Sequence, residues 1–416
     1  MKPGRKQTEV GLIPEDWDVQ SIGQMFQLIN GCAFKPQDWK QTGTPIIRIQ
    51  NLNDPHASFN YSQSPVAERN RVEAGDLLFA WSGTIGTSFG ARIWAGPSGV
   101  LNQHIFKVLP DERKITTSFS LLVFARIEED IAKQAHGFKA SFVHVKKSDL
   151  IKVKLPIPPR REQRAIAEAL SDVDALLAAL DRLIAKKRDL KQAAMQQLLT
   201  GKVRLPGFHG EWKKTTLGDV STRCFSGATP RRNRPDYFKG DIPWITSGEL
   251  NYNVITDTVE KITSEAVART NLSIVPKGIF LMAITGLEAE GTRGSCGIVG
   301  IPSTTNQSCM AIFPTSELVS EFLFHYYVFR GDALALKYCQ GTKQQSYTAK
   351  LVKLLPIELP PTPAEQTAIA GVLNEMETEL TSLEQRRDKT RALKQGMMQE
   401  LLTGRTRLVS PESAHA

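Results

Sequence analysis

Two long segments of the chain carry an apolar residue at every third or fourth position, which places these side chains on one face of an α-helix. The first series is Ile166, Leu170, Val173, Leu177, Leu180 and Ile184, and the second is Ile369, Leu373, Met376, Leu380 and Leu383. Prolines precede each segment, and each ends at a Thr-Gly pair, Thr200-Gly201 or Thr403-Gly404, whose glycine suits a left-handed helix end. The pattern predicts two helices of about 40 residues, roughly 60 Å long.

The spacing is interrupted near Lys187 and Thr390, as a stutter in a heptad pattern would allow. It resumes at Leu190, Ala194 and Leu198 and at Leu393, Met397 and Leu401, which we expect to continue the seam. One helix of this length alone has no surface against which to bury its stripe. We therefore expect the two helices to pair as an antiparallel coiled coil. The alternative is that each helix packs only against its own neighbouring domain.

The chain contains an internal repeat of half its length. Residues 190–205 match residues 393–408, 203 positions further on, and Glu162-Gln163 matches Glu365-Gln366 at the same offset. Looser matches with a drifting offset connect the preceding segments, such as Asn102-Gln103 with Asn306-Gln307. A period this long indicates duplication with pseudo-two-fold symmetry rather than a solenoid of short units.

The segments before the helices predict strand-rich domains with some helix. Short apolar runs stand between Gly, Pro and Asn signals, which is typical of strands. These runs are 46–49, 76–80 and 105–108 in the first half and 242–245, 279–284 and 311–313 in the second, with a short helix near 118–126 and near 318–330. We predict an α+β fold with a first domain at 1–157, a helical spacer at 158–205, a second domain at 206–360, a second spacer at 361–409 and a tail at 410–416.

The composition of the chain indicates which class of partner it binds. Lys and Arg number 52 against 43 Asp and Glu, so the formal net charge is +9, which favours a polyanionic partner, nucleic acid or an acidic membrane surface. No stretch approaches about 18 uncharged apolar residues, and the start has no secretory signal core, so we expect no membrane span. Five cysteines without a C-x-x-C pair predict free thiols in a reducing cytoplasm, not disulfides or a metal site.

No motif for catalysis was found. The chain has no phosphate-binding loop, dinucleotide fingerprint, metalloprotease helix, nucleophile elbow or methyltransferase motif. His104 corresponds to Ser308 in the repeat, so its position does not require an imidazole. The sequence therefore predicts a chain without catalytic or metal-ligating residues.

Polar and basic residues gather in corresponding loops of the two halves. Arg can bind guanine, Asn and Gln can bind adenine, and Lys can hold phosphates, so we interpret these loops as DNA-binding, with solvated surface loops as the alternative. The candidates are Lys35, Arg48, Gln50, Asn51, Ser82, Thr84, Asn102, Gln103, His104 and Lys139, and Thr229, Arg231, Arg232, Asn233, Arg234, Ser247, Arg293, Asn306, Gln307, Lys343 and Gln344.

The order of these segments resembles the specificity (S) subunits of type I restriction–modification systems over nearly the whole chain. The resemblance rests on two diverged domains, two near-identical helical segments, a Pro…Glu-Gln-x-x-Ile-Ala start at Glu162 and Glu365, and a Leu-Leu-Thr-Gly-x-x-Arg-Leu end. Gly11 to Trp17, Gly227 to Pro230 and Ile242 to Ile245 are similar to the family's domain openings. One residue more separates the prolines from Glu-Gln in the second copy, which leaves the exact helix start open.

The resemblance implies a non-catalytic subunit with two target-recognition domains that read a split, asymmetric double-stranded DNA target, three to five base pairs each. It implies two methyltransferase (M) subunits docked on the helices and two restriction/translocase (R) subunits, and no membrane. S-adenosylmethionine, ATP and Mg would bind to the partners and no cofactor to this chain. Two alternatives stay open: a scaffold that binds proteins without reading DNA, and a self-contained DNA enzyme.

Overall fold

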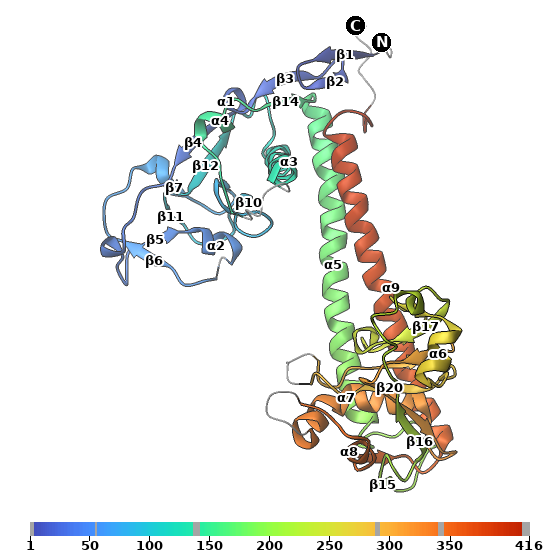
Figure 1. The fold of residues 1–416 in the computed structure, drawn as a ribbon. Coiled ribbons are helices and arrows are strands. Elements are labelled where there is room, and N and C mark those ends of the chain that lie inside the picture. The colour runs from blue at the N-terminus through green and yellow to red at the C-terminus, as the bar shows by residue number, and fades with distance from the viewer. Residues whose placement is uncertain (1–3, 55, 136–141, 288–291, 340–344, 410–416) are drawn as a thin grey trace. The chain divides into compact units, whose positions relative to one another are not determined.

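The computed structural model describes residues 4–54, 56–135, 142–287, 292–339 and 345–409. The chain divides into two compact units: unit 1 comprises residues 1–179 and 386–416, and unit 2 comprises residues 180–385. The two longest helices in Figure 1 are α5 (Arg160–Leu198) and α9 (Pro363–Leu401), each of 39 residues. Since the division cuts both helices, each unit contains one part of α5, one part of α9 and one strand-rich domain.

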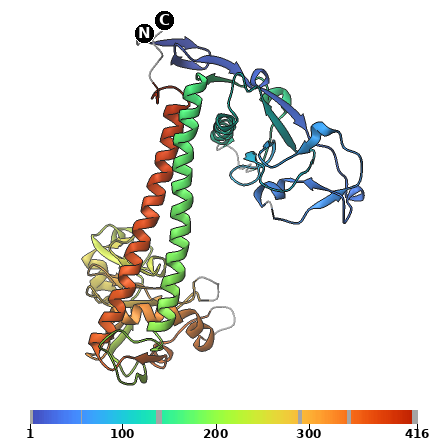
Figure 2. The same cartoon turned by 180° about the vertical axis from the view of Figure 1, so that it is seen from behind.

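The two long helices pair in antiparallel fashion. In unit 1, Ile166 near the start of α5 shares a buried core with Leu401 and Leu402 at the end of α9. In unit 2, Leu198 at the end of α5 shares a core with Ile369 near the start of α9. Figures 1 and 2 show the helices side by side from two directions. The expected antiparallel pairing is confirmed, and the alternative, in which each helix packs only on its own domain, is wrong.

The seam buries most, but not all, of the predicted positions. Buried are Ile166, Leu170, Leu180, Ile184, Ile369, Leu373 and Leu380, and half-buried are Val173, Leu177, Met376 and Leu383. The prediction was wrong for Leu190 and Leu393, which are 46% and 59% exposed. At these two positions the next residues, Lys191 and Lys394, face the partner helix instead. The later predicted positions are confirmed, since Leu198 and Leu401 are buried and Ala194 and Met397 are half-buried.

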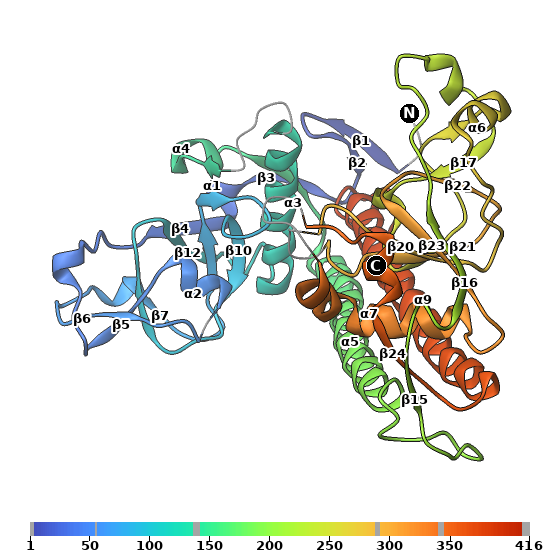
Figure 3. The ribbon, with the colours of Figure 1, turned by 60° about the horizontal axis from the view of Figure 1, so that its bottom comes forward.

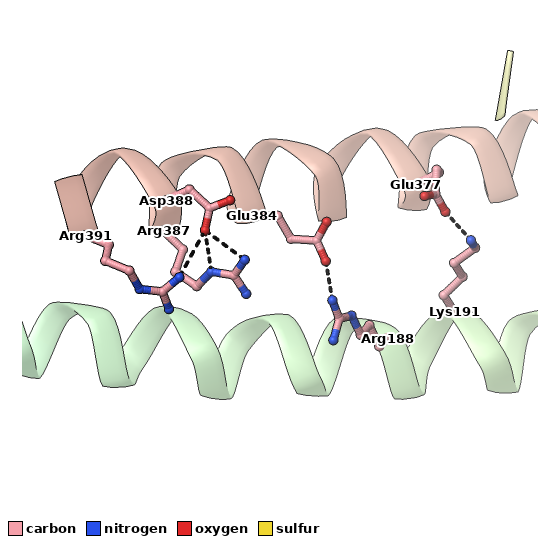
Figure 4. Close-up of polar contacts among 7 residues, drawn as sticks. All are labelled: Arg188, Lys191, Glu377, Glu384, Arg387, Asp388 and Arg391. Carbon is pink, nitrogen blue, oxygen red and sulfur yellow. Dashed lines mark hydrogen bonds and ion pairs between the residues drawn. The ribbon is translucent and has the colours of Figure 1, made fainter. Parts of the chain in front are cut away.

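Ion pairs between the helices replace apolar contacts at the interruption. In unit 2, Lys187 Nζ lies 2.7 Å from Glu379, Lys191 pairs with Glu377, and Arg188 pairs with Glu384. Figure 4 shows the last two pairs crossing from one helix to the other. In unit 1, Lys394 Nζ lies 2.6 Å from Asp174. Lys394–Asp174 and Lys191–Glu377 are the same contact in the two copies of the 203-residue repeat.

The strand-rich domain of unit 1 contains two four-stranded sheets, ordered β10-β8-β12-β4 and β6-β5-β11-β7. Neighbours in the first sheet are antiparallel, and β5 pairs with β11 in parallel. The strands are β4 (Phe26–Asn30), β5 (Thr44–Ile47), β6 (Asn60–Ser62), β7 (Arg71–Val72), β8 (Leu77–Ala80), β10 (Gly90–Ile93), β11 (Gly99–Leu101) and β12 (Ile105–Pro110). Two strand pairs outside these sheets are β1 (Arg5–Thr8) with β2 (Gly11–Pro14) and β9 (Ser82–Thr84) with β13 (Phe142–His144), and a third is described below.

The strand-rich domain of unit 2 repeats this plan. A five-stranded sheet has the order β16-β23-β20-β21-β18, and a three-stranded sheet has the order β19-β17-β22, in which β17 and β22 are parallel. The strands are β16 (Ser221–Ser226), β17 (Ile242–Ile245), β18 (Asn253–Ile255), β19 (Lys261–Ile262), β20 (Phe280–Ala283), β21 (Cys296–Val299), β22 (Thr304–Thr305) and β23 (Cys309–Pro314). Figure 3 shows α6 (Ser264–Thr270) beside β17.

One longer helix covers the first sheet of each domain. Helix α3 (Thr117–Ala135) packs on β8 and β10, and α7 (Ser320–Tyr338) packs on β20 and β21. Both lie where the sequence predicted a helix but extend further, because their inner faces have apolar sheet to cover. The shorter helices are α1 (Ile22–Met25), α2 (Ile49–Asn53), α4 (Lys147–Leu150) and α8 (Ala349–Lys353), and the 3-10 turns are η1 (Pro36–Asp38), η2 (Glu68–Asn70), η3 (Pro235–Phe238) and η4 (Ser247–Glu249).

The chain enters and leaves each domain through a pair of adjacent strands, which we call the neck. In unit 1 the neck is β3 (Asp18–Ser21) with β14 (Lys154–Ile157), and in unit 2 it is β15 (Lys213–Thr216) with β24 (Pro356–Leu359). Both pairs are antiparallel over four residues. The neck therefore joins each strand-rich domain to its helices at one place.

Candidate nucleic-acid interface

The glutamines at the helix starts tie α5 and α9 to their domains. Gln163 Oε1 accepts a hydrogen bond from the backbone N–H of Thr116, and its Nε2 donates to the carbonyl of Lys114, both at 2.8 Å. Gln366 makes the equivalent bonds with Val319 and Glu317. Both glutamines are buried, so each holds the loop that precedes α3 or α7 against a helix start.

Each glutamate at a helix start binds an arginine from the segment that follows the end of the other helix. Glu162 is fully buried, accepts a hydrogen bond from Trp17 Nε1 at 2.9 Å and pairs with Arg407 Nε at 2.6 Å. Glu365, 1% exposed, accepts two bonds from Arg204, from Nε at 2.6 Å and Nη2 at 2.7 Å. Burial alone would lower the pKa of Arg407, but its bonds to Glu162 and Asp16 outweigh burial and raise it. We call these two pairs the end locks.

The supported domains present the predicted polar loops on the same backbone frame. In unit 1, the N–H of Trp81 donates to the carbonyl of His104, and the carbonyl of Trp81 accepts from Val145. In unit 2, Ile284 makes the same two bonds with Ser308 and Tyr347. We call residues 81–84, 102–104 and 142–145 the loop corner of unit 1, and residues 284–285, 306–308 and 345–347 the loop corner of unit 2.

The two loop corners carry different side chains. In unit 1 the rings of His104 and His144 lie 5.2 Å and 4.7 Å from that of Trp81. Trp81 Nε1 and His104 Nδ1 are buried without a hydrogen-bond partner in the described part of the chain. In unit 2, Thr285 Oγ1 donates to Ser308 Oγ at 2.7 Å. At equivalent positions of this frame, Trp81, His104 and Val145 of unit 1 correspond to Ile284, Ser308 and Tyr347 of unit 2.

The predicted residues of unit 1 differ in exposure. Lys35, Gln50 and Gln103 are exposed; Arg48, Thr84, Asn102 and His104 are half-buried; Asn51 and Ser82 are buried; Lys139 lies outside the described residues. Asn51 Oδ1 accepts from the N–H of Arg48 and Nδ2 donates to the carbonyl of Ala57, so a base contact would require it to leave this position. Arg48 stacks over Trp39, 4.8 Å from the ring centre.

The predicted residues of unit 2 lie mostly on the surface. Thr229, Arg231, Arg232, Asn233, Arg234 and Gln307 are exposed; Ser247, Arg293 and Asn306 are half-buried; Lys343 and Gln344 lie outside the described residues. Arg293 donates to the carbonyl of Leu287 at 3.1 Å and lies 3.5 Å from Asp332, which anchors it to its own domain. The structure brings together Thr229 and Gln307, which share a hydrogen bond.

Two residues near these loops were not predicted. His144 lies against Trp81, and Arg269 on α6 lines a pocket with Arg231 and Arg234. His144 could have been found by aligning the two halves, since it corresponds to Ser346 in the loop corner of unit 2. Arg269 is a single cation on a short helix, and no sequence pattern distinguishes it from other surface arginines. Among the described residues no cluster of His, Cys, Asp and Glu could hold a metal ion, and none of the described helices could cross a membrane.

Comparison with known proteins agrees with this arrangement. A family model described as "Type I restriction modification DNA specificity domain" matches residues 14–187 and 209–391. The putative type I restriction enzyme MjaX specificity subunit of Methanocaldococcus jannaschii is 24% identical over 430 residues, which cover 97% of this chain and 96% of that protein.

Two solved structures share the fold. A type I restriction–modification S subunit from M. genitalium has a TM-score of 0.57 at 15% identity, covering 96% of this chain and 99% of that one. A chain from a structural study of complex assembly and conformational transition in the type I R-M system has a TM-score of 0.58 at 16% identity, covering 95% and 99%. With two matched specificity domains and paired helices, this chain belongs to the type I restriction–modification DNA specificity family, as a specificity subunit.

Proposed function

We propose that this chain reads a bipartite, asymmetric DNA target, with one half-site for each strand-rich domain. The observation that carries the proposal is that the two loop corners share the same backbone hydrogen bonds but have different side chains at equivalent positions. Neutral donors and acceptors such as Asn102 and Gln103, or Asn306 and Gln307, can bind base edges. Since the frame is kept and the chemistry differs, the two domains would read different sequences.

We propose further that the chain catalyses nothing itself and directs partner subunits to DNA. Two M subunits would bind S-adenosylmethionine and methylate adenine, and two R subunits would use ATP and Mg to translocate and cleave DNA. The specificity subunits of type I systems are non-catalytic, and one of the similar structures comes from a study of assembly in such a system. The end locks support this division of roles, because they use the buried acids Glu162 and Glu365 for structure.

The paired helices offer equivalent docking positions for two copies of one partner. Leu190 on α5 and Leu393 on α9 are 203 residues apart in the repeat, and both are exposed although they stand in an apolar pattern. Exposed leucines at equivalent positions are expected at a partner interface. We assign them to the M subunits, one copy at each leucine.

The proposal is tested by sequencing adenine methylation in the host and measuring DNA binding by the chain with its M subunit. We expect one split methylated motif and an affinity that falls steeply with salt. Absence of DNA binding in the presence of M would favour the scaffold alternative. Methylation by the isolated chain supplied with S-adenosylmethionine would favour the self-contained enzyme.

Substituting both exposed leucines with glutamate, L190E with L393E, is expected to abolish co-purification of the M subunit, because a charge placed in an apolar interface is left without a partner. Each single variant should retain one M subunit where the wild type holds two, measured by native mass spectrometry.

The matched control is Leu354→Glu, since Leu354 is 54% exposed and lies outside the paired helices. It should retain both M subunits. Undiminished binding of two M subunits by the double variant would show that these leucines are not the docking positions.

A further inference from the structure

A basic pocket in unit 2 shares no lining residue with the loop corner. It has a volume of about 410 Å³ and is lined by Arg231, Arg234, Tyr237, Glu265, Arg269 and Thr270. Its arginines come from two elements, the loop before η3 and the last turn of α6. Their convergence on one cavity is a product of the fold, because Arg234 and Arg269 are far apart in the sequence.

The pocket lies against a small hydrophobic core, with which it shares Tyr237. Tyr237 of η3, Trp244 of β17, Ile262 of β19 and Ala266 of α6 are buried together. Helix α6 is fixed at its start, where Thr263 Oγ1 accepts from the N–H of Ala266 at 3.2 Å. The pocket wall is therefore built on packed elements.

Arg234 is held in place by two of the three nitrogens of its guanidinium group. Its Nε and Nη2 donate to the two carboxylate oxygens of Asp236 at 2.9 and 2.6 Å, and its Cζ lies 4.6 Å from the ring centre of Tyr237. The hydrogen bond to Asp236 raises the pKa of Arg234, so it stays charged. Because Nε and Nη2 donate to Asp236, the remaining nitrogen, Nη1, has no hydrogen-bond partner among the described residues.

The four arginines near η3 and α6 divide into two kinds. Arg232 donates from both Nη atoms to Glu260, at 2.5 and 2.8 Å, and covers Phe238 and Trp244, so it is committed to the fold. The side chains of Arg231 and Arg269 are exposed and form no hydrogen bond or ion pair within the described residues. Three positively charged groups therefore line the pocket, while the negative charges near them are those of Glu265 and of Asp236, which is already paired with Arg234.

We propose that this pocket binds a phosphodiester group of the DNA backbone and acts as the anchor of the unit 2 domain, while the neutral loop corner reads bases. This inference rests on the proposed DNA-reading function. Guanidinium groups bind phosphate oxygens through charge-assisted, often bidentate hydrogen bonds. Phosphate contacts set position and register and carry no sequence information directly. In unit 1, Lys35 precedes Pro36 as Arg234 precedes Pro235, a corresponding place for a cation.

The test is the double variant Arg231→Ala with Arg269→Ala, in the full chain bound to its M subunit. Affinity for a target duplex and for an unrelated duplex, measured by fluorescence anisotropy, should fall by a similar factor, on the order of tenfold. Each lost phosphate contact should reduce the slope of log K against log salt by about 0.9. The methylated sequence should not change.

The matched control removes two lysines from the neck, Lys213→Ala with Lys214→Ala, both exposed and of the same total charge. It should leave the affinity nearly unchanged. On a target series with single methylphosphonate linkages, one linkage should weaken wild-type binding and have no further effect on the arginine variant, which separates a backbone phosphate from any other anion.

Two results would overturn the assignment while leaving the proposed function intact: an affinity equal to that of the control, or a relaxed methylation sequence at one base, which would make these arginines base readers. A wild-type complex that bound no DNA would instead refute the proposed function, and the phosphate pocket with it.

Discussion

Arg407→Ala is expected to destabilise unit 1 by about 3–5 kcal/mol, because it leaves the buried carboxylate of Glu162 without its cation. The carboxylate of Glu162 is fully buried, and when Arg407 is removed its one remaining hydrogen bond within the described residues comes from Trp17. Arg204→Ala should act equally on unit 2 through Glu365. Each substitution should loosen one end of the helix pair.

Hydrogen exchange resolved by peptide is the suitable measurement, because unfolding of two units is not a two-state process. Arg407→Ala should accelerate exchange at the start of α5, and Arg204→Ala at the start of α9. The control is Arg405→Ala, whose side chain is 61% exposed and pairs with Glu400 on the surface; it should cost less than about 1 kcal/mol. Equal effects of Arg405→Ala and Arg407→Ala would show that the end lock contributes little.

Exchange of the unit 2 domain with that of another family member is expected to replace one half of the DNA target completely. The cut points should lie just inside the neck, after Thr216 and before Pro356, because β15 and β24 lie side by side there. Each wrong base pair costs about 1–3 kcal/mol. Loss of three or more correct pairs should therefore weaken binding to the original target by more than about a hundredfold.

Methylation sequencing of the hybrid decides the outcome. The half-site read by unit 1 should be unchanged, and the other should be that of the donor protein. The reciprocal control exchanges the unit 1 domain inside its own neck, β3 with β14, and should alter the opposite half. A change of both half-sites in either hybrid would refute independent reading.

The repeat and the helix pair could be predicted from the sequence because they leave a periodic signal. The partners of the buried glutamates could not, since Glu162 and Arg407 are 245 residues apart and only the antiparallel pairing brings them together. The prediction that Leu190 and Leu393 lie in the seam was wrong for a related reason. An apolar residue in a heptad pattern predicts a seam position, but at the interruption the next residues, Lys191 and Lys394, face the partner helix and the two leucines face outward.

The candidate DNA-binding residues were chosen by type and loop position, and neither property reports burial. Asn51 has the chemistry of a base reader, yet its amide completes the turn at α2. Arg232 and Arg234 are near neighbours in the sequence and differ in role, because Glu260 takes both Nη atoms of one and Asp236 takes only one Nη of the other. Arg269 is the opposite case, a single cation on a short helix that only the fold places in one pocket with Arg231.

The division of the chain also sets the order in which its parts can mature during translation. Unit 2 is continuous, whereas unit 1 needs residues 386–416, made about 200 residues after its first part and on the order of 10–40 s later on the ribosome. Until then Ile166 and Leu170 lack the cover of Leu401 and Leu402, and Glu162 lacks Arg407. The domain made first is thus the last to be completed, and a premature stop after residue 385 damages the beginning of the protein more than its middle.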